Sequence, residues 1–229
     1  MSESGSEQLT CRIVTKPALH ILEAKIPLAF IDRINAYIDG IRGGAADYSH
    51  ELVGQIRRDK RSAQLQMNLR DRIPTDLANL VMQIAAQYVE FHGFRAKIAV
   101  NDMWTVHSYD GDYNPLHDHG ANTELGLSSI LYLKVPEAIA AKQTTEGTVP
   151  DLHRASGNCD GFTQFVWGAT ASKDVSLLRH PAQSYVKPEV GKLLVFPNWL
   201  LHGVLPFFGE GERRTLSCNM DVEILTDAV

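Results

Sequence analysis

Histidines in two separated segments have the spacing and surroundings of metal ligands. His117 and His119 stand two residues apart in YNPLHDHG. Alternate side chains of a strand point to the same face, so both imidazoles can share one face while Asp118 lies on the other. His202 follows far downstream in the apolar segment FPNWLLHGV, where a buried imidazole needs a partner. The three histidines are candidate ligands for iron, copper, zinc or nickel, all of which bind imidazole.

A second candidate binding segment, RRTLSCN, lies near the C-terminus. Alternation along a strand would place four polar side chains on one face: Arg213, Thr215, Ser217 and Asn219. A polar row facing the core is costly unless it meets a ligand. An arginine with a hydroxyl two residues further on is suited to grip a carboxylate. The alternative is an ordinary surface salt bridge.

Each of these patterns also has a simpler structural explanation. A histidine pair in a polar stretch is often plain surface, and a buried histidine is often satisfied within the core. The other histidines have no ligand-like spacing and are expected to be structural or exposed; they are His20, His50, His92, His107, His153 and His180. Among these, His107 could support the metal ligands from outside, because it precedes the turn that leads to His117.

The elements that must position these residues are helices first and strands afterwards. Apolar residues at helical spacing predict a helix over Leu28–Ile41 and another from about Pro74 to Gly93, capped by Thr75 or Asp76. Alternation and turn residues predict strands at residues 11–26, 96–107, 124–135, 162–167, 184–186, 192–196, 200–206 and 213–224. This order indicates an α+β fold, in which helices brace a double-stranded β-helix, or jelly-roll, core.

The predicted domain organisation is a disordered leader over residues 1–10 and a single domain over residues 11–229. Its helical part would cover about residues 28–93 and its β core about residues 94–224. Residues 48–72 and 137–180 are expected to form loops that carry specificity. The basic run within the first loop is either a solvated segment or a flap that meets an acidic substrate; it comprises Arg57, Arg58, Lys60 and Arg61.

Composition excludes several classes of protein. The 229 residues carry a net charge of −5, which favours neither nucleic acid nor an anionic membrane as partner. The three cysteines are far apart, which argues against a disulfide framework or thiolate zinc site. Residues 1–8 do not form a signal peptide, and no apolar run approaches the roughly 20 residues of a membrane span. We expect a soluble, cytoplasmic protein.

The order of the motifs resembles the Fe(II)/2-oxoglutarate-dependent oxygenase superfamily. The likeness covers roughly residues 99–222 and is most specific over residues 190–219. It is greatest to oxygenases of phages and marine bacteria, distantly similar to prolyl-4-hydroxylases. The resemblance implies Fe(II), 2-oxoglutarate as cosubstrate and O2, with His117 and His202 as iron ligands. It also implies that Arg213 and Thr215 bind 2-oxoglutarate and that Tyr132 lines its pocket.

One position departs from the superfamily pattern, because His119 stands where a carboxylate is usual. The site could use three histidines, a bulge could turn Asp118 inward, or the chain could bind iron poorly. The function implied is hydroxylation of a peptide side chain or small molecule. Alternatives are a three-histidine dioxygenase that does not use 2-oxoglutarate, and a non-catalytic jelly-roll binding or virion-associated module. The sequence specifies neither the substrate nor the oligomeric state.

Overall fold

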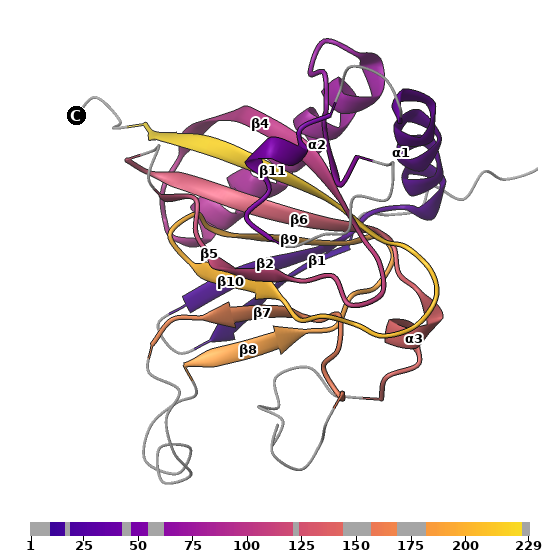
Figure 1. Ribbon diagram of the computed structural model, residues 1–229. Coiled ribbons are helices and arrows are strands. Elements are labelled where there is room, and N and C mark those ends of the chain that lie inside the picture. Colours follow the sequence, from indigo (N-terminus) through magenta and orange to yellow (C-terminus); the bar gives the residue numbers. More distant parts are fainter. Residues whose placement is uncertain are drawn as a thin grey trace, which may run out of the picture.

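Two antiparallel sheets and two long helices make up the computed structural model (Figure 1). It describes residues 10–16, 19–42, 47–54, 62–120, 124–143, 157–168 and 182–225. The predicted disordered leader, apart from Thr10, and the basic run of residues 57–61 lie outside these ranges. No helix in the described ranges is long and apolar enough to span a membrane.

The larger sheet has seven strands in the order β1-β2-β9-β6-β11-β4-β3, and the smaller sheet has the order β5-β10-β7-β8. The helices are α1 (Leu28–Ile41), the short 3-10 helix η1 (Ser49–Glu51), α2 (Arg72–Phe91) and α3 (Glu137–Ala140). The strands are β1 (Thr10–Lys16), β2 (Leu19–Lys25), β3 (Gln64–Gln66), β4 (Ala96–Ser108), β5 (Asn114–His117), β6 (Gly126–Lys134), β7 (Thr163–Val166), β8 (Gln183–Val186), β9 (Lys192–Pro197), β10 (Leu201–Val204) and β11 (Arg213–Ile224).

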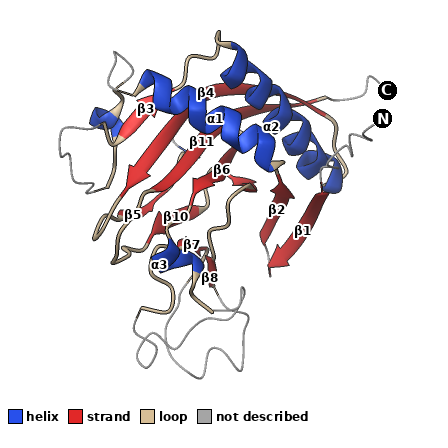
Figure 2. Cartoon of the chain, turned by 90° about the vertical axis from the view of Figure 1, so that its right-hand side faces the viewer, coloured by secondary structure: helices blue, strands red, loops and turns tan. Residues whose placement is uncertain are grey.

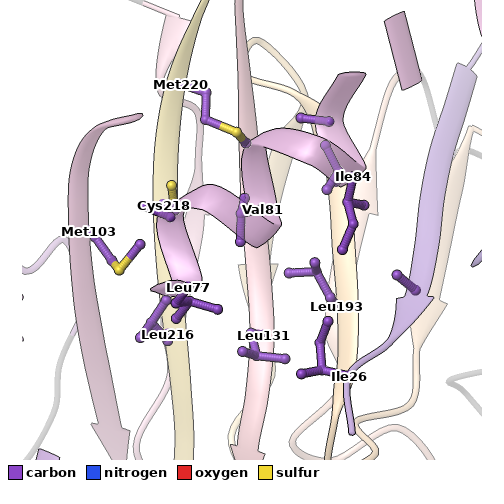
Figure 3. Packing of buried hydrophobic residues seen from close by; sticks show 14 of the residues in the cluster. Ile26, Leu77, Val81, Ile84, Met103, Leu131, Leu193, Leu216, Cys218 and Met220 are labelled. Atoms are coloured by element: carbon purple, nitrogen blue, oxygen red, sulfur yellow. The ribbon is translucent and has the colours of Figure 1, made fainter. Parts of the chain in front are cut away.

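Helices α1 and α2 cover one face of the larger sheet (Figure 2). The apolar stripe of α2 packs on this face, where Leu77, Val81 and Ile84 lie over side chains of β6, β9 and β11 (Figure 3). A second apolar cluster fills the space between the sheets and includes Phe165 from β7 and Phe196 from β9. The fold is therefore α+β with a two-sheet jelly-roll core, as predicted.

Strand β11 contributes to both sides of the larger sheet. Leu216 and Cys218 pack into the helix-side cluster, whereas Arg213, Thr215 and Ser217 line a pocket on the opposite face. The alternation predicted for this segment is confirmed. Because β11 lies between β4 and β6, its pocket-facing side chains are held in register by neighbours on both edges.

The helix boundaries were predicted with unequal success. The first helix is confirmed over Leu28–Ile41, but the second begins at Arg72, after the N-cap residue Asp71. The prediction that Thr75 or Asp76 caps it is wrong, because Thr75 lies within the first turn and its hydroxyl donates to the carbonyls of Leu69 and Asp71. Pro74 is tolerated there because first-turn N–H groups have no intrahelical acceptor.

Most predicted strands are confirmed with shifts of one or two residues, and residues 11–26 form two strands. Within residues 48–72, which were expected to form a loop, the structure places the short strand β3 at Gln64–Gln66. The long loop expected after β6 contains α3, while residues 144–156 and 169–181 lie outside the described ranges.

Candidate metal centre

The smaller sheet brings the three candidate histidines together. His117 ends β5 and is the Cα partner of His202 in β10. His119 lies two residues beyond β5, and its backbone N–H donates to the carbonyl oxygen of Asn198 at 2.9 Å. Potential ligand atoms of the three imidazoles all lie within 4.8 Å of one another. Among the described residues, this is the one cluster of metal-ligating side chains.

Backbone carbonyls orient two of the three rings. The Nδ1 atom of His117 lies 2.8 Å from the carbonyl oxygen of Pro115, and Nδ1 of His202 lies 2.9 Å from that of Leu200. Since a carbonyl can only accept, each Nδ1 carries the proton and donates. The Nε2 atom of each neutral ring then keeps its lone pair, and metal-binding histidines are commonly oriented by such a bond.

Burial keeps two of the candidate ligands, His119 and His202, neutral. It lowers the pKa of His202 to about 3 and that of His119 to about 4, and the neighbouring His117 acts in the same direction on both. At neutral pH these two imidazoles are therefore unprotonated, which is the form that binds a metal. The donor set fits a divalent metal because it offers neutral nitrogen ligands that converge.

Asp118 is arranged differently from its neighbours. Its side chain is exposed at the pocket, and Oδ1 accepts the backbone N–H of Gly120 at 3.0 Å. The ring of His119 instead packs edge-on against Trp104, with centroids 5.6 Å apart. Of residues 118 and 119, the geometry therefore groups His119 with the other two histidines.

Arg213 is a buried cation in the same pocket. Its side chain is 1 % exposed, Nε donates to the Gly161 carbonyl at 3.0 Å, and Nη2 donates to Oγ1 of Thr163 at 3.2 Å. Burial lowers its pKa, but a guanidinium stays charged at physiological pH. No described carboxylate forms an ion pair with it. A buried charge without a counter-ion is costly, so an anionic ligand would complete this site.

Of the other two residues predicted to contact the cosubstrate, Thr215 lines the pocket and Tyr132 does not. Thr215 is buried on the same face of β11 and lines the pocket. Tyr132 lies behind the arginine, outside the pocket lining, with its ring centroid 5.4 Å from the guanidinium carbon. The Tyr132 hydroxyl is hydrogen-bonded to Oγ1 of Thr163 at 2.7 Å. From this position Tyr132 would orient Arg213 and would not touch a ligand in the pocket.

The pocket measures about 290 Å³ and is lined by the three histidines and Arg213 together. The sequence interpretation missed other residues of its wall: Tyr48, Glu51, Gln64, Asp102 and Trp104. Alternation along β4 offered a signal for Asp102 and Trp104, which share the face of Val106. His107 points to the opposite side, where it contacts Thr105 and Glu212, away from the metal ligands.

Comparison with known proteins identifies the family of the chain and its fold. The family model of 2OG-Fe(II) oxygenases matches residues 102–219. No curated protein matches the sequence. Among solved structures, the chain is similar to viral collagen prolyl hydroxylase from Paramecium Bursaria Chlorella virus-1 in its 2OG complex, with 16 % identity over 87 % of this chain and 94 % of that one, and a TM-score of 0.51.

Two bacterial structures show the same likeness. AviO1 from Streptomyces viridochromogenes Tue57 is 15 % identical over 84 % of this chain and 83 % of its own, with a TM-score of 0.50. HygX from Streptomyces hygroscopicus, with iron bound, is 11 % identical over 92 % of this chain and 81 % of its own, also with a TM-score of 0.50. At these identities the likeness establishes a shared fold.

Proposed function

Because the chain belongs to the 2OG-Fe(II) oxygenase family, we propose that it couples oxidative decarboxylation of 2-oxoglutarate to hydroxylation of a substrate C–H bond. The cofactors of the family are Fe(II), 2-oxoglutarate and O2. Bound together, they would convert a C–H group to C–OH while 2-oxoglutarate becomes succinate and CO2. The observation that carries the proposal is that converging histidines and a buried, unpaired arginine face one pocket.

In this proposal His117, His119 and His202 hold the iron. The carbonyls of Pro115 and Leu200 fix two of the rings so that their Nε2 atoms face the metal. Three protein ligands leave about three coordination positions open, enough for a bidentate cosubstrate and O2. The protein would supply geometry and exclusion of water, and the iron would supply reactivity.

Arg213 would bind the distal carboxylate of 2-oxoglutarate, assisted by the hydroxyl of Thr215. Thr163 and Tyr132 would position the guanidinium, because both contact it or its hydrogen-bond partner. Charge-assisted hydrogen bonds of this kind are strong, and here they would also neutralise a buried cation. A dioxygenase that does not use 2-oxoglutarate, or a non-catalytic module, would leave this arginine without a counter-ion.

The experiment is anaerobic titration of the protein with Fe(II) and 2-oxoglutarate, followed by the visible charge-transfer band of chelation. We expect a band that is lost in His202→Ala. In Arg213→Met it should require much more 2-oxoglutarate, because the apolar side chain fills the space without the charge. Arg33→Met, an exposed change on α1, is the matched control. Bound iron without a 2-oxoglutarate-dependent band would overturn the proposal.

A further inference from the structure

The floor of the pocket runs from Arg213 at one end to Asp102 at the other. In the β4–β11 ladder Arg213 pairs with Ser108, and Asn219 pairs with Asp102. The six-residue separation along β11 places the two ends about 20 Å apart at strand spacing. Trp104 lies two residues from Asp102 on the same face, and His119 packs on it. The histidines therefore lie between Arg213 and Asp102.

The end away from Arg213 is acidic. Asp102, Glu51 and Asp118 all line the pocket, and Arg213 is the only lysine or arginine among the described lining residues. No described lysine or arginine forms an ion pair with any of the three carboxylates, and Glu51 contacts only His50, at 3.4 Å. The described residues at this end therefore carry a net negative charge.

Hydrogen bonds hold Asp102 in place without neutralising it. Its Oδ2 accepts the hydroxyl of Tyr48 at 3.1 Å, and Oδ1 accepts the backbone N–H of Met103 at 2.9 Å. Burial raises the pKa of Tyr48, and the nearby carboxylates of Asp102 and Glu51 raise it further. The tyrosine thus remains a donor to Asp102, and the aromatic rings of Tyr48 and Trp104 flank the acidic end.

Gln64, which lies on the wall between the two ends, gives an independent indication that the pocket receives a hydrogen-bond donor. Its side chain is 5 % exposed, and within the described part of the chain its Oε1 has no hydrogen-bond donor. Gln64 pairs with Val106 in the β3–β4 ladder, and both line the pocket. Asn114, another lining residue, has a buried Oδ1 that also lacks a donor among the described residues. Unsatisfied buried acceptors are costly, so a ligand that donates hydrogen bonds would satisfy both the amides and the carboxylates.

We infer that the acidic end of the pocket, formed by Asp102 and Glu51, binds an ammonium or guanidinium group of the substrate, with Gln64 as a further acceptor on the wall between the two ends. The inference rests on the proposed function and names its substrate class as cationic nitrogen compounds. The 2-oxoglutarate would occupy the Arg213 end, and the substrate would reach the iron from the acidic end. An acidic substrate, expected if the basic run of residues 57–61 formed a flap, would be repelled by the described wall.

The test uses butylguanidine, which carries one guanidinium, as probe and N-butylurea as its uncharged analogue, in which a urea replaces the guanidinium. Each is titrated calorimetrically into the anaerobic protein loaded with Fe(II) and 2-oxoglutarate. We expect butylguanidine to bind at least about tenfold more tightly, since a charge-assisted hydrogen bond contributes that much. Asp102→Asn should abolish the preference, and Gln64→Met should weaken butylguanidine binding severalfold.

Two further variants guard against indirect effects. Glu51→Gln changes an exposed position and should reduce the preference without affecting folding. Asp221→Asn removes an exposed charge from β11 outside the pocket and should leave it unchanged. Equal affinity for the two probes, including no binding of either, would overturn the inference. The charge-transfer band reports on the proposed function separately: wild-type protein that prefers butylguanidine but forms no band would retain the cation subsite and reject the oxygenase chemistry.

Discussion

His117 and His202 are Cα partners across the β5–β10 ladder, and each donates its Nδ1 hydrogen to the carbonyl two residues before it. Their ring centroids lie 4.5 Å apart. The same local arrangement therefore occurs on both strands, so the backbone of the smaller sheet orients both rings. In the proposed site this orientation would leave the Nε2 atom of each ring available to a shared metal.

The first prediction concerns which neighbour completes this pair. His119→Ala should weaken Fe(II) binding by more than about tenfold, because it removes a converging nitrogen ligand. Asp118→Ala should leave Fe(II) binding nearly unchanged, since its carboxylate is exposed and bonded to Gly120. Anaerobic equilibrium dialysis with metal analysis measures both. The opposite ranking of the two variants would assign the ligand role to Asp118.

The second prediction concerns the geometry of anion binding by Arg213. Arg213→Lys keeps the charge but loses the planar guanidinium, whose Nε and Nη2 are held by Gly161 and Thr163. We expect the KM for 2-oxoglutarate to rise about ten- to a hundredfold, while kcat at saturating cosubstrate changes less. Succinate formation measured against 2-oxoglutarate concentration checks this. An unchanged KM would separate Arg213 from the cosubstrate.

The third prediction is a loss of stability of the metal-free protein in acid. The folded pKa values of His119, about 4, and His202, about 3, lie below the ordinary value of about 6.5. The unfolded chain therefore binds more protons below about pH 6.5, so stability that is full above this value falls as the pH decreases toward the folded pKa values. From about pH 7.5 to 5 we expect a loss of about 1–2 kcal/mol per histidine.

Urea unfolding in the presence of a chelator measures this loss. A variant with both His119→Gln and His202→Gln lacks the two titrating groups and should show a smaller difference between the two pH values. If its stability falls with pH as steeply as that of the wild type, other groups are responsible.

The fourth prediction separates the structural core from the site. Leu131 is fully buried under the helices, on the face of β6 opposite the pocket (Figure 3). Leu131→Ala should lower the free energy of unfolding by about 2–5 kcal/mol through lost packing and a cavity. Leu125→Ala, at a half-exposed position just before β6, should cost much less. Denaturant unfolding measures both, and folded Leu131→Ala protein should still bind Fe(II) as the wild type does.

Local sequence patterns were sufficient wherever one stretch carried its own periodicity. The bounds of α1 follow from apolar residues such as Ile31, Ile34 and Ile38, which recur on one helix face. The two faces of β11 follow from strict alternation, which a strand converts directly into opposite sides of a sheet. The candidate histidines and Arg213 could be singled out because their residue types are unusual in such apolar or alternating surroundings.

Only the tertiary structure decided features that depend on distant partners. The start of α2 was misplaced because the hydroxyl of Thr75 donates to the carbonyls of Leu69 and Asp71 instead of capping the helix. The carboxylate of Asp71 in turn accepts hydrogen bonds from Asn68 and from Tyr37 on α1. The position of Tyr132 behind Arg213 requires Thr163 from the other sheet. Such long-range contacts leave no periodic signal in the sequence.

The same reason explains what the sequence determined about the site and what it did not. Residue types and spacing determined that imidazoles and a guanidinium were available for a metal and an anion. Whether His119 or Asp118 converges with the other histidines depends on the backbone path beyond β5, which the Asn198 carbonyl holds. Among the described residues, the unsatisfied acceptors of Gln64 and Asn114 became visible only in the fold, because a missing partner is a property of all the segments that surround a group.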